Sequence, residues 1–201
     1  MKRIILVLSI IVCHLLFSPA GAQTARQVLD KTAAAVTNKD GVTANFKLTN
    51  NQGSISGTIA VKGQKFHATT AHGMMWFDGK TQWTYMKKND EVNVNNPSEA
   101  ELQAINPYNF INMYKNGFKY TMTSNATSHN VHLTATNPKR KVQEMFIIVD
   151  KKSYAPTQVK MLQGKNWTTF DITNLKKEAL SDALFRFNSK DFPTAEVIDL
   201  R

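Results

Sequence analysis

Apolar and polar residues alternate along most of this chain, and this period of two constrains its fold more than any other feature. Short alternating runs are separated by turn residues, which is typical of antiparallel strands. We expect these strands at Val42–Leu48, Ile55–Val61, Phe66–Thr70, Met74–Phe77, Thr81–Met86, Val92–Val94, Phe118–Ser124, His129–Thr136, Val142–Val149, Thr157–Leu162 and Trp167–Leu175. A sheet of about ten strands curls or closes. It therefore has a concave apolar face, which either a helix covers or a ligand fills.

Helical patterns flank and interrupt this sheet. Thr24 and Gln27 form a capping-box pattern. The apolar stripe behind them predicts a helix that ends before Gly41. Two short helices are expected at about 98–105 and 107–115, and a short piece near 179–187 precedes a polar tail.

The first residues have the pattern of a secretory signal peptide. Lys2 and Arg3 precede an apolar run, and small residues end the segment at Ala22. We expect residues 1–22 to be removed and 23–201 to form a single domain. Cys13 lies within the signal, so residues 23–201 contain no cysteine. That domain depends on its core rather than on disulfides, and it has neither thiol chemistry nor a cysteine metal site.

Residues 23–201 carry 23 basic and 15 acidic side chains, a formal charge of +8. Nucleic acid is disfavoured as a partner, because the chain is exported and its lysines are scattered. The densest group, Lys139-Arg140-Lys141, follows Asn137-Pro138 and is either a solvated loop or a docking site. An anionic membrane surface or an acidic protein partner fits the charge.

Catalytic patterns are weak. The sequence has no HExxH motif, no Gly-x-Ser-x-Gly elbow and no phosphate loop. Asp90, Glu91, Glu99 and Glu101 cluster in sequence, but they lie beside turns or in the first turn of a predicted helix. We therefore expect a binding protein rather than an enzyme, with no cofactor and no metal. An exported hydrolase with unrecognised carboxylates is the alternative from another class.

The hairpin at Met74–Met86 is rich in methionine and aromatic residues. Such side chains adapt to irregular apolar shapes and suit acyl chains, although a plain core has the same composition. The segment from Trp76 to Tyr85 resembles the Asp-Gly-Lys-x-x-Trp-x-Tyr hairpin of the periplasmic outer-membrane lipoprotein carrier (LolA) family. The order of helix, strands and helical insertion is similar, and Phe185-Arg186-Phe187 resembles the Phe-x-Phe near the end of that family.

This resemblance implies a mostly β fold, an incomplete (half-open) antiparallel β-barrel with helices covering the concave face. It also implies a monomeric periplasmic carrier that takes lipoprotein acyl chains from an inner-membrane lipoprotein-releasing transporter and passes them to an outer-membrane acceptor. The expected lipid-binding residues are Val42, Ala44, Phe46, Ile59, Val61, Phe66, Met74, Trp76, Trp83, Tyr85, Leu102, Ile105, Phe110 and Ile111. The last four belong to the helical lid, which competes with cargo for the apolar face.

The sequence departs from the family directly after Val61-Lys62. The best-known carriers have an arginine followed by proline after the Val-Lys pair, and this arginine latches the lid. Here Gly63-Gln64 follow Val61-Lys62, and the nearby Lys65 has no planar guanidinium. This departure leaves open whether the cargo is the usual lipoprotein, and a carrier or sensor of a glycolipid or phospholipid is the second hypothesis.

Overall fold

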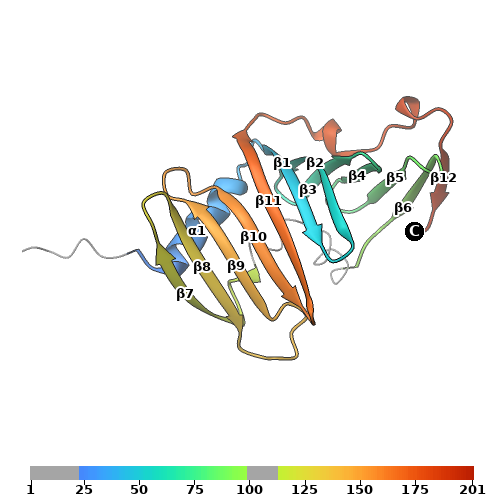
Figure 1. Ribbon diagram of the computed structural model, residues 1–201. Coiled ribbons are helices and arrows are strands. Elements are labelled where there is room, and N and C mark those ends of the chain that lie inside the picture. Colours follow the sequence, from blue (N-terminus) through green and yellow to red (C-terminus); the bar gives the residue numbers. More distant parts are fainter. Residues whose placement is uncertain (1–22, 99–112) are drawn as a thin grey trace, which may run out of the picture.

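The computed structural model describes residues 23–98 and 113–201. Within these residues one open sheet has the strand order β12-β6-β5-β4-β3-β2-β1-β11-β10-β9-β8-β7 (Figure 1). The strands are β1 (Val42–Asn50), β2 (Gly53–Lys62), β3 (Lys65–Thr70), β4 (Gly73–Phe77), β5 (Gln82–Met86), β6 (Glu91–Asn95), β7 (Phe118–Ser124), β8 (Ser128–Ala135), β9 (Glu144–Asp150), β10 (Pro156–Gln163), β11 (Asn166–Lys177) and β12 (Glu196–Asp199). The predicted signal peptide and nearly all of the two predicted short helices lie outside the described residues.

The sheet consists of two antiparallel meanders. Strands β1 to β6 follow one another through hairpins, as do β7 to β11, and β1 pairs with β11 to join the two groups. The mostly β, half-open architecture expected from the sequence is therefore confirmed.

The prediction of a polar tail at the end of the chain is wrong in one respect, because part of this segment forms a strand. β12 pairs in parallel with β6, and hydrogen bonds extend this pairing at both ends. The Glu196 amide donates to the Asp90 carbonyl at 2.9 Å, and the Leu200 amide donates to the Val94 carbonyl at 2.8 Å. A strand of four residues with acidic ends is too short for its alternation to be recognised.

Helix α1 (Ala25–Val36) begins with the predicted capping box. The Gln27 amide donates to Thr24 Oγ1 at 3.2 Å, and the Thr24 amide donates to Gln27 Oε1 at 2.9 Å. These two bonds satisfy backbone donors that a helix start leaves unpaired. Among the described residues, no helix is both long enough and apolar enough to cross a membrane.

The apolar stripe of α1 packs on one face of β7–β11, which we call the inner face (Figure 1). Val28 and Leu29 of the helix are almost fully buried there. The strand residues in this core are Phe118, Val131, Leu133, Met145, Ile147, Val149, Val159 and Met161. This cluster is the main hydrophobic core and holds α1 over that half of the sheet.

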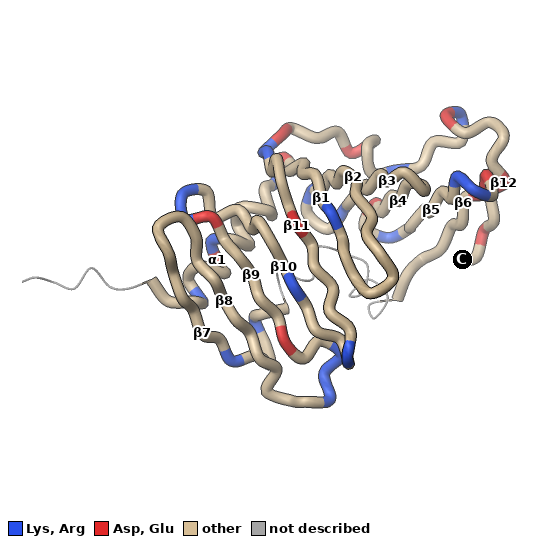
Figure 2. Tube along the Cα trace, viewed as in Figure 1, with Lys and Arg blue, Asp and Glu red and all other residues tan. Residues whose placement is uncertain are grey.

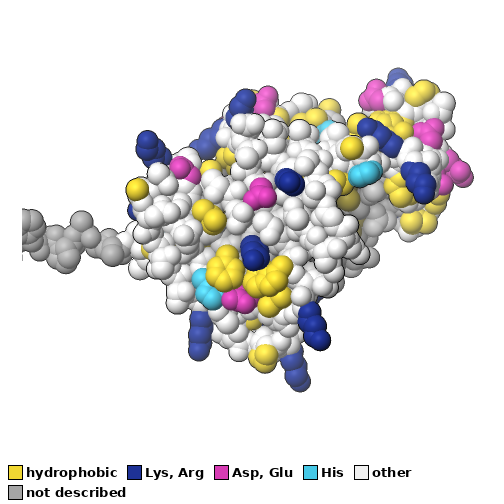
Figure 3. Space-filling model, viewed as in Figure 1, with side chains coloured by type: hydrophobic (Ala, Val, Ile, Leu, Met, Phe, Trp, Pro, Cys, Tyr) yellow, Lys and Arg dark blue, Asp and Glu magenta, His cyan; other side chains and the backbone are white. Residues whose placement is uncertain are grey.

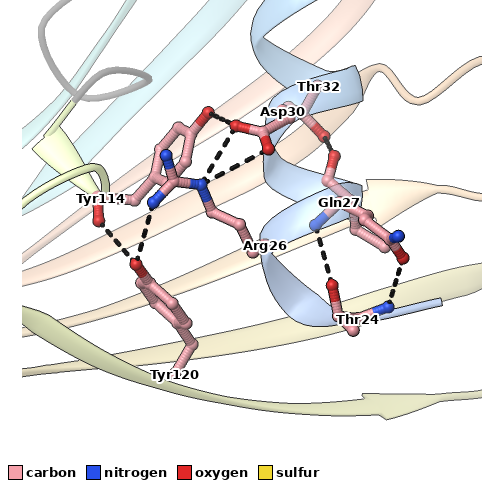
Figure 4. A network of polar contacts seen from close by, with 8 residues as sticks. Thr24, Arg26, Gln27, Asp30, Thr32, Tyr114 and Tyr120 are labelled. Carbon is pink, nitrogen blue, oxygen red and sulfur yellow. Dashed lines mark hydrogen bonds and ion pairs between the residues drawn. The ribbon is translucent and has the colours of Figure 1, made fainter.

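A polar network also holds α1 to the chain that leads into β7 (Figure 4). The Tyr114 hydroxyl donates to Asp30 Oδ1 at 2.6 Å, and Arg26 Nε lies 3.3 Å from the same oxygen. Arg26 also donates to the Tyr120 hydroxyl at 3.4 Å. Tyr114 is 1% exposed, so its hydroxyl depends on Asp30 for its hydrogen bond.

The C-terminal segment covers the opposite, outer face of β3–β5. It contains two short 3₁₀ helices, η1 (Asp182–Phe185) and η2 (Ser189–Asp191). Phe187 and Phe192 place their rings 5.6 Å from the ring of Trp76, and Phe192 lies 4.6 Å from Tyr85. The segment therefore packs on the outer face of the half of the sheet that α1 does not cover.

Candidate functional site

A pocket of about 530 Å³ lies on the inner face, beside the area that α1 covers. Its volume is within the range of small-molecule sites. The lining residues are Val36, Val42, Ala44, Phe46, Leu48, Ile55, Ile59, Val61, Phe66, Ala68, Thr70, His72, Gly73, Met74, Met75, Thr84, Tyr85, Met86, Pro156, Val159, Phe170, Ile172 and Leu175. The described lining contains no lysine, arginine, aspartate or glutamate, so it favours an uncharged apolar ligand.

Strand register arranges the inner-face residues of β1–β4 in rows, because residues directly opposite each other share a face. The first row is Val42, Val61, Phe66 and Phe77, which are 1–9% exposed. The rings of Phe66 and Phe77 lie 5.5 Å apart and contribute to a second, smaller core cluster. This row closes one end of the pocket.

Burial decreases along the strands away from this closed end. Phe46 and Leu48 of β1 and Ile55 of β2 are half-buried, and His72, just before β4, is exposed. Phe46, Leu48 and Ile55 lie toward the turn at Asn50–Gly53. The pocket is therefore more open at this turn end of the sheet.

The absence of a side chain at Gly57 makes room for the Phe46 ring in the pocket. The two residues are direct neighbours across β1 and β2. A Cβ at Gly57 would lie 3.0 Å from Cζ of Phe46 and would collide with the Thr69 carbonyl oxygen. The missing side chain lets the Phe46 ring lie across β2.

A β-bulge in β11 directs side chains into the other wall. The register shifts so that Ala44 faces both Asn174 and Leu175, and Asn174 has a φ of 54°. The extra residue changes the alternation, and Ile172 and Leu175 both line the pocket. Asparagine tolerates this left-handed conformation better than most residues do.

Eight of the predicted lipid-binding residues line the pocket: Val42, Ala44, Phe46, Ile59, Val61, Phe66, Met74 and Tyr85. Tyr85 contributes at the border, because its ring packs against Phe192 on the outer face. Leu102, Ile105, Phe110 and Ile111 lie outside the described residues.

Trp76 and Trp83 do not line the pocket, and their predicted placement needs correction. They face each other across β4 and β5, so they share a face. Trp76 stacks on His67 at 5.2 Å and packs against the C-terminal segment, which places both tryptophans on the outer face. Alternation separates Trp76 from Met75 and Phe77, but it does not say which set faces the cavity.

Sequence reasoning also missed part of the lining. Leu48 and Ile55 continue the alternation of Phe46 and Ile59, and that signal could have found them. Val36 comes from the last turn of α1, whereas Pro156, Val159, Phe170, Ile172 and Leu175 come from β10 and β11. Only the pairing of β1 with β11 brings this last group to the pocket.

Lys62 and Lys65, which flank Gly63-Gln64, bind the C-terminal segment. Their ammonium groups lie 3.0 and 2.8 Å from the carboxylate of Asp182. The hydrogen bond from Lys65, followed by that from Lys62, lowers the pKa of Asp182 to about 2. Neither lysine lines the pocket, so both anchor η1 to the β2–β3 turn instead.

The comparisons with known proteins agree with this fold. A family model described as outer membrane lipoprotein carrier protein LolA matches residues 17–165. An uncharacterized conserved protein from Thermus thermophilus is similar with a TM-score of 0.61 and 11% identity, over 88% of this chain and 99% of that chain. MucB is similar with a TM-score of 0.51 and 12% identity, over 84% of this chain and 64% of that chain. The comparison with curated proteins gives no match.

Proposed function

Because the chain belongs to the outer membrane lipoprotein carrier protein LolA family, we propose that it carries the acyl chains of lipoproteins in the inner-face pocket. The signal peptide at residues 1–22 exports it to the periplasm. There it takes cargo from an inner-membrane lipoprotein-releasing transporter and delivers it to an outer-membrane acceptor. Carriage makes and breaks no covalent bond, so the protein acts as a binding protein.

The observation that carries this proposal is the apolar pocket beside α1. Its volume is about 530 Å³, and its described lining is mostly hydrocarbon, with Thr70, His72, Thr84 and Tyr85 as the residues with polar side-chain groups. Each acyl CH₂ that leaves water for such a site contributes about 0.8 kcal/mol. A saturated acyl chain has no hydrogen-bond donor or acceptor, and the lining has few polar groups that would be left unpaired by it.

A second candidate is a carrier or sensor of another amphiphile, such as a glycolipid or phospholipid. The uncharged lining favours this candidate equally, because it selects the tail and leaves the headgroup outside. Gly63-Gln64 stand where the family arginine is expected, and the flanking Lys62 and Lys65 bind Asp182, so any lid latch differs from the arginine latch. Mass spectrometry of the lipids that co-purify from the periplasm distinguishes a lipoprotein from a glycolipid or phospholipid.

The pocket assignment is tested by Ile59→Asp with Thr58→Asp as its control. Ile59 lines the pocket, whereas its neighbour Thr58 is exposed on the outer face of the same strand. We expect Ile59→Asp to weaken binding of a fluorescent long-chain fatty acid by more than about tenfold, because the carboxylate must be desolvated. Thr58→Asp should bind within about twofold of the wild type.

The same pair is then compared for lipoprotein pull-down from the periplasm. Circular dichroism and urea unfolding check that both variants are folded. Equal retention of fatty acid and lipoprotein by the two folded variants would contradict the pocket assignment. Turnover of an ester substrate by the wild type would favour the hydrolase alternative.

A further inference from the structure

An exposed aromatic patch lies on the outer face of β8–β11, opposite α1 (Figure 3). It comprises His132, Glu144, Phe146, Lys160 and Trp167, which come from four adjacent strands. His132 stacks on Phe146 with ring centroids 4.2 Å apart, and Trp167 lies 5.9 Å from Phe146. The patch is solvent-accessible, since Phe146 is 37% exposed.

Charged and aromatic side chains alternate within this patch. Lys160 Nζ lies 4.5 Å from the centre of the Trp167 ring, and His132 Nε2 lies 2.7 Å from Glu144 Oε1. The centre of a protein–protein interface is depleted of lysine and glutamate. A bilayer interface accepts this mixture, because aromatic rings and lysine stems enter the headgroup layer while the charged ends stay hydrated.

Basic side chains surround the lower end of the patch. Lys139, Arg140 and Lys141 lie in the β8–β9 loop, Lys165 in the β10–β11 turn, and Lys119 near the start of β7 (Figure 2). All but Arg140 are exposed, and the guanidinium of Arg140 lies 4.8 Å from the centre of the Phe118 ring. Glu144, the acidic member of the patch, is hydrogen-bonded to His132, and the basic residues around the patch outnumber it. This end of the sheet therefore favours an anionic surface.

The open end of the pocket lies at the same end of the sheet. Asn51 Nδ2 donates to Asn166 Oδ1 at 3.2 Å, which connects the β1–β2 turn with the β10–β11 turn. Leu48 and Ile55, which line the open part of the pocket, are close to that β1–β2 turn. A partner surface in contact with the basic turns would therefore lie next to the opening of the pocket.

We propose that the aromatic patch and the basic turns dock this protein on a bilayer that contains anionic phospholipids. Docking turns the open end of the pocket toward the lipid from which an acyl chain enters. The entry of an acyl chain from the bilayer rests on the proposed function, but the docking itself does not depend on an occupied pocket.

The test is co-sedimentation with vesicles of phosphatidylcholine, with and without phosphatidylglycerol. Wild-type protein should sediment with the anionic vesicles and be released by salt. The double variant Lys139→Glu/Lys141→Glu should bind at least about tenfold more weakly, because charges close to the headgroups are reversed. Phe146→Ser/Trp167→Ser should also bind more weakly.

The matched control is Lys176→Glu/Lys177→Glu. These lysines are exposed at the opposite end of β11, beside Thr43 and Val42, and their reversal changes the net charge equally. This control should bind anionic vesicles within about twofold of the wild type. Thermal unfolding checks that every variant is folded.

Three results would overturn the docking proposal: no sedimentation of the wild type with anionic vesicles, equal losses for the two lysine pairs, or no loss for the aromatic variant. An acidic protein as the true partner would give the first of these results. The pocket is assessed separately with the fluorescent fatty acid. Lys139→Glu/Lys141→Glu should retain fatty-acid binding, whereas Ile59→Asp should lose it and still sediment with anionic vesicles.

Discussion

The contact between Tyr114 and Asp30 fixes α1 relative to the entry into β7. Burial, and then the hydrogen bond to Asp30, raises the pKa of Tyr114, because both disfavour the phenolate. The hydroxyl therefore remains a donor at neutral pH. This hydrogen bond thus ties the helix that borders the pocket to the chain that leads into the second meander.

We expect Tyr114→Phe to lower the free energy of unfolding by about 1–2 kcal/mol. The variant removes a buried hydrogen bond to a charged acceptor, but the half-exposed Asp30 can turn to water and to Arg26. Urea denaturation measures the change. Tyr120→Phe is the control, because its hydroxyl makes longer contacts, at 3.3 Å to the Tyr114 carbonyl and 3.4 Å to Arg26. Equal losses in the two variants would refute a special role for Tyr114.

The tryptophans show what residue types alone could not predict. Alternation correctly separates Met75 and Phe77 from Trp76. Trp76 nevertheless lies on the outer face, where the rings of Phe187 and Phe192 pack against its ring. These partners are more than a hundred residues away in sequence, so no local pattern could have assigned the face.

At the scale of elements, local signals predicted most of the fold. The capping box marked the start of α1, and Asp78-Gly79 marked the β4–β5 hairpin, where Gly79 has a φ of 102°. The bulge at Asn174 and the pairing of β12 were not predicted. Both depend on which strand lies alongside, and such long-range pairing leaves little trace in a short segment.

The bulge gives a prediction for β11. Asn174→Val should lower the free energy of unfolding by about 1–2 kcal/mol, because a β-branched residue is strained at a φ of 54°. It should also weaken fatty-acid binding, since Leu175 depends on the bulge for its direction. Asn174→Gly should keep both properties near wild type. Thr173→Val, an exposed neighbour on the same strand, controls for the exposed valine side chain.

Urea denaturation and fatty-acid titration are the two measurements for this series. If Asn174→Val and Thr173→Val behave alike in both, the strained conformation has no role in shaping the pocket.

At the scale of the molecule, the two halves of the sheet are built differently. The inner face of β7–β11 is packed by α1, whereas that of β1–β4 borders the pocket. The number of strands predicted a curled sheet with an apolar face to be covered or filled. Among the described residues, the part of the inner face that α1 leaves uncovered depends on how far the helix reaches, and its apolar stripe does not reveal that.

This division predicts where a ligand acts. Saturating fatty acid should slow amide hydrogen exchange most in β1–β3, where it also suppresses local opening, and less in β8 and β9, which gain only from the higher global stability. A ligand at about a hundred times its Kd should add about 2.7 kcal/mol to the free energy of unfolding. Hydrogen exchange with mass spectrometry, with Ile59→Asp as the control that shows no slowing, measures the effect. Equal slowing in β8 would place the ligand elsewhere.

The row of Val42, Val61, Phe66 and Phe77 makes the pocket blind at one end. Under the proposed function, an acyl tail that enters from the open end of the described pocket advances only until its terminal methyl meets this row. Each added methylene then strengthens binding up to the depth of the pocket, and further length stays in water without gain. Whatever is attached to the tail remains outside, so its size and shape are free to vary.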